Sequence, residues 1–192
     1  MINESDEPLD SGVVAARLAQ GLDERGTEYA IGGAVALGFW GQPRGTMDVD
    51  ITLFLPKDRP SEVVWELQEI GCDMSATRAI AMLREHGYCS VKYRSVRVDV
   101  FVPTNSFYDL AKQRRRRVRL GRQEATVFDA ESLAVFKMMF FRPRDIVDLQ
   151  SMIRIQGARL DRDWVRERLI ELVGPRDPRV AQWDELASEH PI

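Results

Sequence analysis

Residues 31–51, IGGAVALGFWGQPRGTMDVDI, place a Gly-Gly pair sixteen residues before an Asp-x-Asp pair, which directly precedes an apolar run. A glycine pair permits backbone torsions and close approaches that other residues resist. Because side chains alternate along a strand, Asp48 and Asp50 point to the same side of it. Two carboxylates so close together repel each other, and a divalent cation between them relieves the repulsion. The segment therefore predicts a glycine turn followed by a cation-binding strand.

A third carboxylate, Asp99, lies in the strongly apolar segment VRVDVFV, residues 96–102. Burying a charge is costly unless the group is paired or binds a metal. If this segment neighbours the Asp-x-Asp strand, the three carboxylates converge, and such oxygen ligands suit Mg²⁺. For Asp99 taken alone, a structural salt bridge explains the sequence equally well. Taken with the glycine turn and the Asp-x-Asp pair, Asp99 favours a metal site.

Composition excludes several classes of protein. The chain has 192 residues and a net charge of -3, which suits one domain, or one domain with a small appendage, and gives no overall attraction to nucleic acid. No apolar run reaches the length of a membrane span. The first ten residues are acidic and polar, unlike a secretory signal, so we expect a cytoplasmic protein without a membrane. Cys72 and Cys89 match no metal-binding spacing, which favours two reduced thiols.

Hydrophobic periodicity predicts an α/β half followed by a helical half. In the first half, Gly26 is expected to end the first helix, Pro56 to end the Asp-x-Asp strand, and Ser61 to cap a helix. The expected helices cover residues 10–25, 34–40, 61–70 and about 77–86, and the expected strands cover residues 27–31, 47–55, 88–93, 96–102 and 124–128. The strands at 88–93 and 96–102 are predicted to form a hairpin.

The pattern becomes helical near residue 130. Four helices are expected, at residues 131–140, 143–156, 161–174 and 177–189. We therefore predict an α/β domain over residues 1–130, with a mixed sheet flanked by helices. Residues 131–192 are predicted to form a C-terminal helical region that packs on the same cleft.

Two segments resemble a known superfamily. GGAVALGFWGQPRGTMDVDI resembles the signature of the polymerase-β-type nucleotidyltransferases, in which a glycine turn opens a helix, an Asp-x-Asp strand follows, and a third acid lies on a later strand. The variant PRGTMDVD is most similar to the AbiEii-like, toxin-type nucleotidyltransferases. ESLAVFKMMFFRPRDIVDLQSMI resembles the downstream helical motif of that group. The resemblance covers about residues 28–155.

The resemblance implies a role for each matching residue of the first motif. Gly32 and Gly33 would let the backbone approach the phosphates of a nucleoside triphosphate (NTP) at the start of a helix. Asp48 and Asp50 would hold one or two Mg²⁺ ions. Asp99 would complete a second metal site or take a proton from the attacking hydroxyl.

Further residues of the two motifs are implied to surround the nucleotide. Arg44 and Thr46 belong to the nucleotide-binding motif, and Arg44 either contacts phosphate or pairs with an aspartate of the Asp-x-Asp to hold the turn. Lys137 would neutralise triphosphate charge, although a lysine on an amphipathic helix more commonly extends to solvent. Asp145 and Asp148 are weaker candidates, because an acid in the first turn of a helix is favoured by the helix dipole without any further function.

Two features leave the substrates open. Gly33 stands where better-known members of the superfamily carry serine, so a hydroxyl contact to phosphate is missing. Residues 112–122, KQRRRRVRLGR, hold seven basic side chains and read either as an RNA-binding strip or as a solvated sheet edge. We favour the solvated edge slightly.

The leading hypothesis is a Mg²⁺-dependent nucleotidyltransferase that moves NMP from an NTP to a hydroxyl of RNA or protein, as the toxin of a toxin–antitoxin pair with a cognate antitoxin. One alternative is a nucleotidyltransferase that modifies a small antibiotic. The other is a relative without catalytic activity that binds a nucleotide or a partner protein. Three converging carboxylates favour an enzyme, because a binding module has no need of them.

Overall fold

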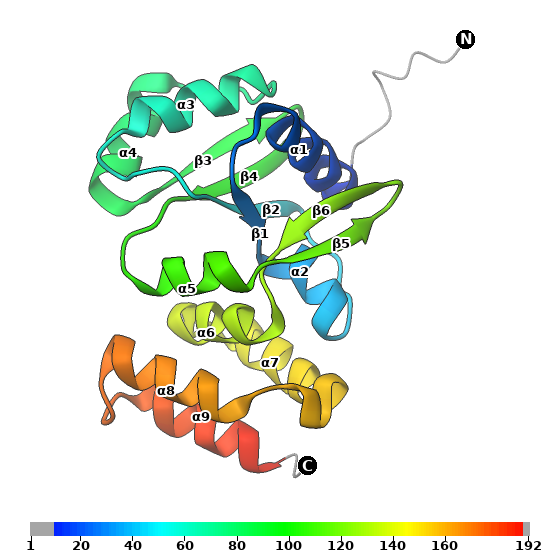
Figure 1. The fold of residues 1–192 in the computed structure, drawn as a ribbon, viewed down its shortest axis with the longest axis vertical. Helices are drawn as coiled ribbons and strands as arrows, with labels where there is room; N and C mark the ends of the chain where they lie inside the picture. The colour runs from blue at the N-terminus through cyan, green and yellow to red at the C-terminus, as the bar shows by residue number, and fades with distance from the viewer. Residues whose placement is uncertain (1–9, 190–192) are drawn as a thin grey trace.

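The Asp-x-Asp pair lies on strand β2 (Asp48–Leu53), in the interior of a six-stranded mixed sheet. The computed structural model describes residues 10–189 (Figure 1). Strand β2 pairs with β1 (Tyr29–Ile31) in antiparallel orientation and with β4 (Val96–Phe101) in parallel orientation. The predicted adjacency of the two acid-bearing strands is therefore confirmed.

The remaining strands extend the sheet on both sides. Strand β3 (Tyr88–Tyr93) forms the predicted antiparallel hairpin with β4. On the other side, β6 (Gln123–Val127) pairs with β1 and carries β5 (Arg116–Leu120) in antiparallel orientation. The strand order is β3-β4-β2-β1-β6-β5, so β3 and β5 are the two edges.

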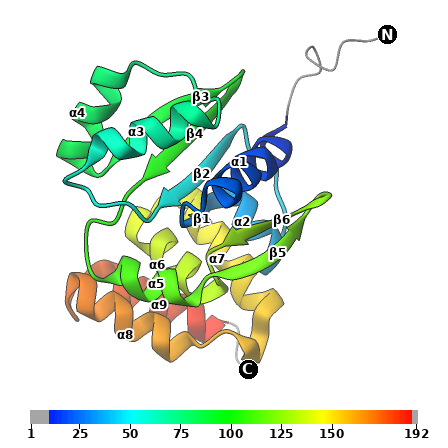
Figure 2. The ribbon, with the colours of Figure 1, turned by 45° about the horizontal axis from the view of Figure 1, so that its top comes forward.

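Three helices cover one face of the sheet: α1 (Ser11–Arg25), α3 (Pro60–Glu69) and α4 (Ala76–His86) (Figure 2). Helix α1 ends at Gly26 with φ 70°, as predicted. The predicted cap of α3 is wrong, because the helix begins at Pro60, ahead of Ser61, and its N-cap residue is Arg59. Proline favours the first helical position, since its φ is already helical and its missing N–H has no partner there.

The cysteines lie beneath this helical layer. Cys72 and Cys89 are both buried and both free, as predicted. Burial raises the pKa of each thiol to about 12. Neither cysteine belongs to the acid-bearing face of the sheet, which is the opposite one.

The helices α2 (Gly33–Trp40), α5 (Phe107–Arg114), α6 (Ala130–Phe140) and α7 (Pro143–Gln156) lie on the acid-bearing side of the sheet (Figure 1). Helix α5 was not predicted. Its buried side chains are only Phe107 and Ala111, which is too few to produce a clear helical period.

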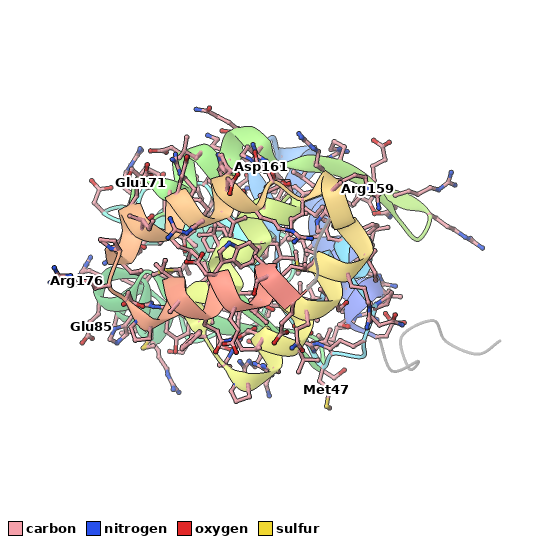
Figure 3. All side chains as sticks on the ribbon, turned by 90° about the horizontal axis from the view of Figure 1, so that it is seen from below. Met47, Glu85, Arg159, Asp161, Glu171 and Arg176 are labelled. Carbon is pink, nitrogen blue, oxygen red and sulfur yellow. The ribbon has the colours of Figure 1, made fainter. Side chains whose placement is uncertain are left out.

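Beyond α7, a 3₁₀ turn (Gly157–Arg159) leads to α8 (Arg162–Val173) and α9 (Pro178–Glu189), which form the outermost layer. Seen from that side, charged residues such as Asp161, Glu171 and Arg176 surround the two helices (Figure 3). None of the helices between residues 10 and 189 is long and apolar enough to cross a membrane.

One continuous hydrophobic cluster joins the α/β half and the helical half. It includes Leu37 of α2, Val135 and Met138 of α6, and Trp183 of α9, each fully or almost fully buried. The sheet face that carries the acids is therefore held against α6 and α7 by a shared core. The predicted boundary at residue 130 remains an interpretation, and the two parts pack together.

Candidate active site

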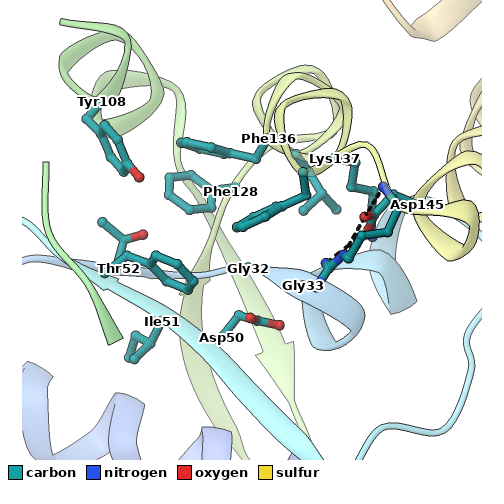
Figure 4. A pocket seen from close by; sticks show the side chains of 14 residues that line it. Gly32, Gly33, Asp50, Ile51, Thr52, Tyr108, Phe128, Phe136, Lys137 and Asp145 are labelled. Atoms are coloured by element: carbon teal, nitrogen blue, oxygen red, sulfur yellow. Dashed lines mark hydrogen bonds and ion pairs between the residues drawn. The ribbon is translucent and has the colours of Figure 1, made fainter. Parts of the chain in front are cut away.

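The glycine turn holds the start of α2 against β2. The Gly32 N–H donates to the backbone carbonyl of Asp50 at 2.8 Å. Gly33 has φ +53°, and a Cβ added there would lie 1.8 Å from Asp50 Oδ2. Only glycine fits this position. Because it has no Cβ, the Asp50 carboxylate can lie against the N-terminus of α2 (Figure 4).

The three predicted carboxylates share one face of the sheet. Asp50 lies opposite Asp99 in the parallel β2–β4 ladder, and Asp48 lies two residues before Asp50. Burial, and to a smaller extent the negative charges of Asp48 and Asp99, raise the pKa of Asp50 to about 6. The site therefore disfavours a charged Asp50 unless positive charge is supplied.

Arg97 lies between two of these acids. It is two residues before Asp99 on β4 and opposite Asp48 in the ladder. Its Nε donates to Asp99 Oδ1 at 3.0 Å, its Nη2 donates to Asp99 Oδ2, and its Nη2 lies 4.0 Å from Asp48 Oδ2. Within residues 10–189, no three Asp, Glu, His or Cys side chains are grouped closely enough to hold a metal ion. The acids are adjacent as predicted, but they do not form a preassembled metal cluster.

The donor set nevertheless fits Mg²⁺ chemically. Hard carboxylate oxygens are the ligands that this ion prefers. Burial and the two neighbouring acids raise the pKa of Asp50, and a divalent cation would counter both effects. Thr46 orients one of these ligands, because its hydroxyl donates to Asp48 Oδ1 at 2.5 Å. In the structure Thr46 thus supports an acid of the site.

Lys137 of α6 lies in the same site and is buried, with 3% of its surface exposed. Its Nζ donates to Asp148 Oδ2 at 2.6 Å and lies 3.7 Å from Asp145 Oδ1. A surface lysine that extends to solvent is therefore excluded at this position. The charge of Lys137 is shared with two aspartates of α7.

Arg44 completes this ion-pair network. Its Nε and Nη2 donate to the two carboxylate oxygens of Asp148, each at 2.9 Å. Arg44 therefore pairs with an aspartate, but not with Asp48 or Asp50 as expected. The reason is that α7 brings Asp148 next to the turn that follows α2. Burial raises the pKa of Asp148, but hydrogen bonds from Arg44 and Lys137 outweigh it and hold that pKa below its ordinary value.

Asp145 both caps a helix and lies beside Lys137. It accepts hydrogen bonds from the backbone N–H of Arg142 at 3.2 Å and from Arg142 Nε at 2.7 Å, which caps the start of α7. It is also fully buried beside Lys137. The acid in the first turn of the helix is thus also part of the site.

A pocket joins these charged groups to an aromatic wall. Gly32, Gly33, Asp50, Lys137, Arg142 and Asp145 line its polar side (Figure 4). Its other side is lined by Phe101, Tyr108, Phe128, Phe136 and Phe140. The pocket is partly open to solvent. An anion and an attached ring system match these two surfaces.

Arg142 and the aromatic wall were not predicted. The aromatic residues come from β4, α5, α6 and the end of β6, so no local pattern joins them. Arg142 could have been found, because it lies in the second motif between Lys137 and Asp145. It is turned into the pocket after Phe141, a non-glycine residue with φ 55° that ends α6.

The basic strip lies away from the pocket. Four of its members are paired with acids of the fold: Lys112, Arg114, Arg115 and Arg117. Strand β5 is an edge strand, three strands from β2, or roughly 14 Å along the sheet. Arg116, Arg119 and Arg122 are exposed and have no acidic partner within residues 10–189. The preferred interpretation, a charged sheet edge, agrees with this geometry.

Comparison with solved structures shows a nucleotidyltransferase-like fold. An antigenic nucleotidyltransferase-like protein from Paracoccidioides brasiliensis is 21% identical, with a TM-score of 0.57 over 92% of this chain and 95% of that one. The antibiotic-resistance factor ANT(2'')-Ia is 14% identical, with a TM-score of 0.57 over 93% and 97%. Its complex with adenylyl-2''-tobramycin is 17% identical, with a TM-score of 0.52 over 91% and 97%.

No protein-family model matches the chain, and neither does any curated protein sequence. The likeness to known proteins is thus one of structure. It confirms the predicted fold class, a mixed sheet flanked by helices. The toxin-type subgroup remains a prediction.

Proposed function

We propose that this chain is a nucleotidyltransferase that transfers NMP from an NTP to a hydroxyl acceptor with the help of Mg²⁺. The observation that carries the proposal is the position of Asp50. Its carboxylate lies against the Gly33 turn at the start of α2 and beside Asp99, within a nucleotidyltransferase-like fold. In that arrangement, the acids that would hold Mg²⁺ lie next to the helix start that would bind phosphate.

The polar side of the pocket supplies the phosphate-binding groups. The first amides of a helix have no helical partner and attract anions. Lys137 and Arg142 line the same polar side, and their positive charges partly oppose the rise in the pKa of Asp50. In this proposal the triphosphate lies between the glycine turn and these two side chains.

Asp48, Asp50 and Asp99 would hold the metal. When bound, Mg²⁺ supplies positive charge to the phosphates and to the three acids. The chain itself orients the reactants and neutralises charge, which is most of what phosphoryl transfer requires of a protein.

The proposed reaction balances as follows. The acceptor hydroxyl oxygen forms a bond to the α-phosphorus, the bond from that phosphorus to the pyrophosphate oxygen breaks, and pyrophosphate leaves. The hydroxyl proton passes to Asp99, or to solvent where Asp99 serves as a metal ligand.

Two acceptor classes compete within this proposal. An RNA or protein acceptor would make the chain a toxin with a cognate antitoxin. Four of the seven basic residues of the strip that supported RNA are paired with acids, however, and none of the seven lines the pocket. A small hydroxylated antibiotic is favoured by the likeness to ANT(2'')-Ia, which extends over almost the whole of both chains. We therefore place the small-molecule acceptor first.

The test is to incubate the protein with each labelled NTP, Mg²⁺ and one acceptor class at a time: hydroxylated antibiotics, total RNA, or cell protein. Pyrophosphate release and a mass increase of one NMP on the acceptor support the proposal. Asp50→Asn is the inactive control, and Asp58→Asn, at an exposed loop position, is the matched active one. NTP binding without transfer to any class would instead favour the non-catalytic alternative.

A further inference from the structure

Arg97 lies on the acid-bearing face, near the start of β4 and opposite Asp48. Its side chain is 60% exposed, whereas that of its main partner, Asp99, is 10% exposed. It donates to both oxygens of Asp99 and lies 4.0 Å from Asp48. Asp50, the remaining acid, has no arginine or lysine within salt-bridge distance among the described residues.

We propose that Arg97 is a built-in counter-cation, which pairs with Asp99 and Asp48 until a divalent cation binds and must leave them for that cation to bind. This proposal rests on the metal requirement of the proposed function. It explains why the acids share a face and yet are not grouped as a metal site.

The contrast with the neighbouring cations supports the proposal. Lys137 is 4% exposed and held by partners that are 1% and 4% exposed, so it is enclosed. The side chain of Arg97 is 60% exposed, and within residues 10–189 it pairs with no acid other than Asp48 and Asp99. Its release to solvent therefore breaks no other ion pair in that part of the chain. Pairs of this exposure are weak compared with a bound divalent ion.

Arg97 and the divalent cation compete for the same two carboxylates. A guanidinium remains charged at all ordinary pH values, so Arg97 does not release the acids by losing its proton. The concentration of the divalent cation therefore controls the exchange. Arg97 acts as a positioning residue: it keeps the two carboxylates in place on β2 and β4 and delays metal binding.

The first test measures Mg²⁺ binding by titration calorimetry, with no nucleotide present. We compare the wild type with Arg97→Gln, Arg97→Lys and the control Lys92→Gln. Lys92 lies opposite Arg97 on β3, is exposed, and has no acidic partner among the described residues. We expect Arg97→Gln to bind Mg²⁺ about threefold to tenfold more tightly, which is the scale of a partly exposed ion pair. Arg97→Lys should be intermediate, and Lys92→Gln should match the wild type.

The second test follows the wild type itself, so it does not depend on a variant that folds. The side-chain Nε–Hε signal of Arg97 is observed by ¹⁵N NMR during Mg²⁺ titration, with the signal of exposed Arg144 as the reference. We expect the Arg97 signal to shift toward that of a free arginine as metal binds. A shift of this kind, with unchanged Arg144, supports displacement.

The outcomes separate this proposal from the one on which it rests. Equal or weaker Mg²⁺ binding by Arg97→Gln, or an Arg97 signal that does not move while the wild type binds metal, overturns the counter-cation and leaves the proposed function standing. Absence of Mg²⁺ binding in every variant overturns both.

Discussion

At the scale of single residues, Asp50 is the group whose charge state the fold disfavours most clearly. Burial and two neighbouring acids raise its pKa from 3.8 to about 6. Between those two values the folded state binds more protons than the unfolded state, so the stability of the wild type falls as pH rises through this window. The shift corresponds to roughly 3 kcal/mol at most.

Asp50→Asn removes this cost. With metal chelated, we expect the variant to be more stable than the wild type by up to about 3 kcal/mol above pH 6, and the difference to vanish below about pH 4. Urea unfolding at several pH values measures it. Asp58→Asn, at an exposed position, should show no such trend. A constant difference at all pH values would mean that Asp50 is not the titrating group.

Gly33 and Gly38 form a natural pair for comparison, because both are glycines of α2. At Gly33 a Cβ would collide with the Asp50 carboxylate, and φ is +53°, whereas at Gly38 nothing lies within 4 Å. Gly33→Ala should destabilise the protein by about 1–3 kcal/mol and abolish transfer. Gly38→Ala should stabilise it by roughly 0.5–1 kcal/mol, since alanine favours a helix. Chemical denaturation distinguishes them, and equal effects would contradict the turn geometry.

At the scale of the elements, a buried ion-pair network joins the turn after α2 to α6 and α7. Asp148 lies at its centre, between Arg44 and Lys137. Asp148→Asn would leave the buried positive charge of Lys137 only partly neutralised. We therefore expect the free energy of unfolding to fall by about 3–5 kcal/mol. Asp184→Asn, which breaks the exposed pair of Asp184 with Arg166, should leave the unfolding midpoint unchanged. Similar unfolding midpoints for both variants would show that the ion-pair network does not stabilise the fold.

Lys137 itself connects that network to the proposed triphosphate. Lys137→Ala should weaken NTP binding about tenfold to a hundredfold, the loss of a charge-assisted contact. Lys137→Arg should not restore it fully, since a planar fork does not replace a compact ammonium group in a buried site. Equilibrium binding of each NTP, on variants shown to be folded by circular dichroism, decides the matter. Equal dissociation constants would remove Lys137 from the nucleotide site.

At the scale of the whole molecule, one hydrophobic cluster runs through both halves. We therefore expect the chain to unfold in a single transition. Trp65 of α3 and Trp183 of α9 report on the two halves, and ¹⁹F NMR of protein labelled with 5-fluorotryptophan follows both during urea unfolding. Their midpoints should coincide. Separate midpoints would instead support a division into two domains at residue 130.

Much of this architecture follows from local sequence patterns. The alternation in MDVDITLF and VRVDVFV predicts two strands with acids on one face, and the glycine pair predicts the turn that α2 requires. The helical half has a clear 3.6-residue period. These features depend on residues that are close in the sequence, and the structure confirms them.

The pairings within the site could not be predicted in the same way. Arg44 and Asp148 are 104 residues apart, and nothing local indicates that α7 lies beside the turn after α2. The aromatic wall is assembled from four separate elements. Arg97 is different, because its spacing from Asp99 places both on one face, and the same alternation rule that located the acids could have located it.

The buried cysteines have a practical consequence for following this molecule in solution. A thiol whose pKa is about 12 is almost entirely protonated at neutral pH, and the thiolate is the form that alkylating reagents attack. Because Cys72 and Cys89 are the chain's two cysteines, the folded protein presents an almost unreactive background to such reagents. A cysteine introduced at an exposed position such as Arg144 would then carry a fluorophore or spin label selectively, without removal of either native thiol.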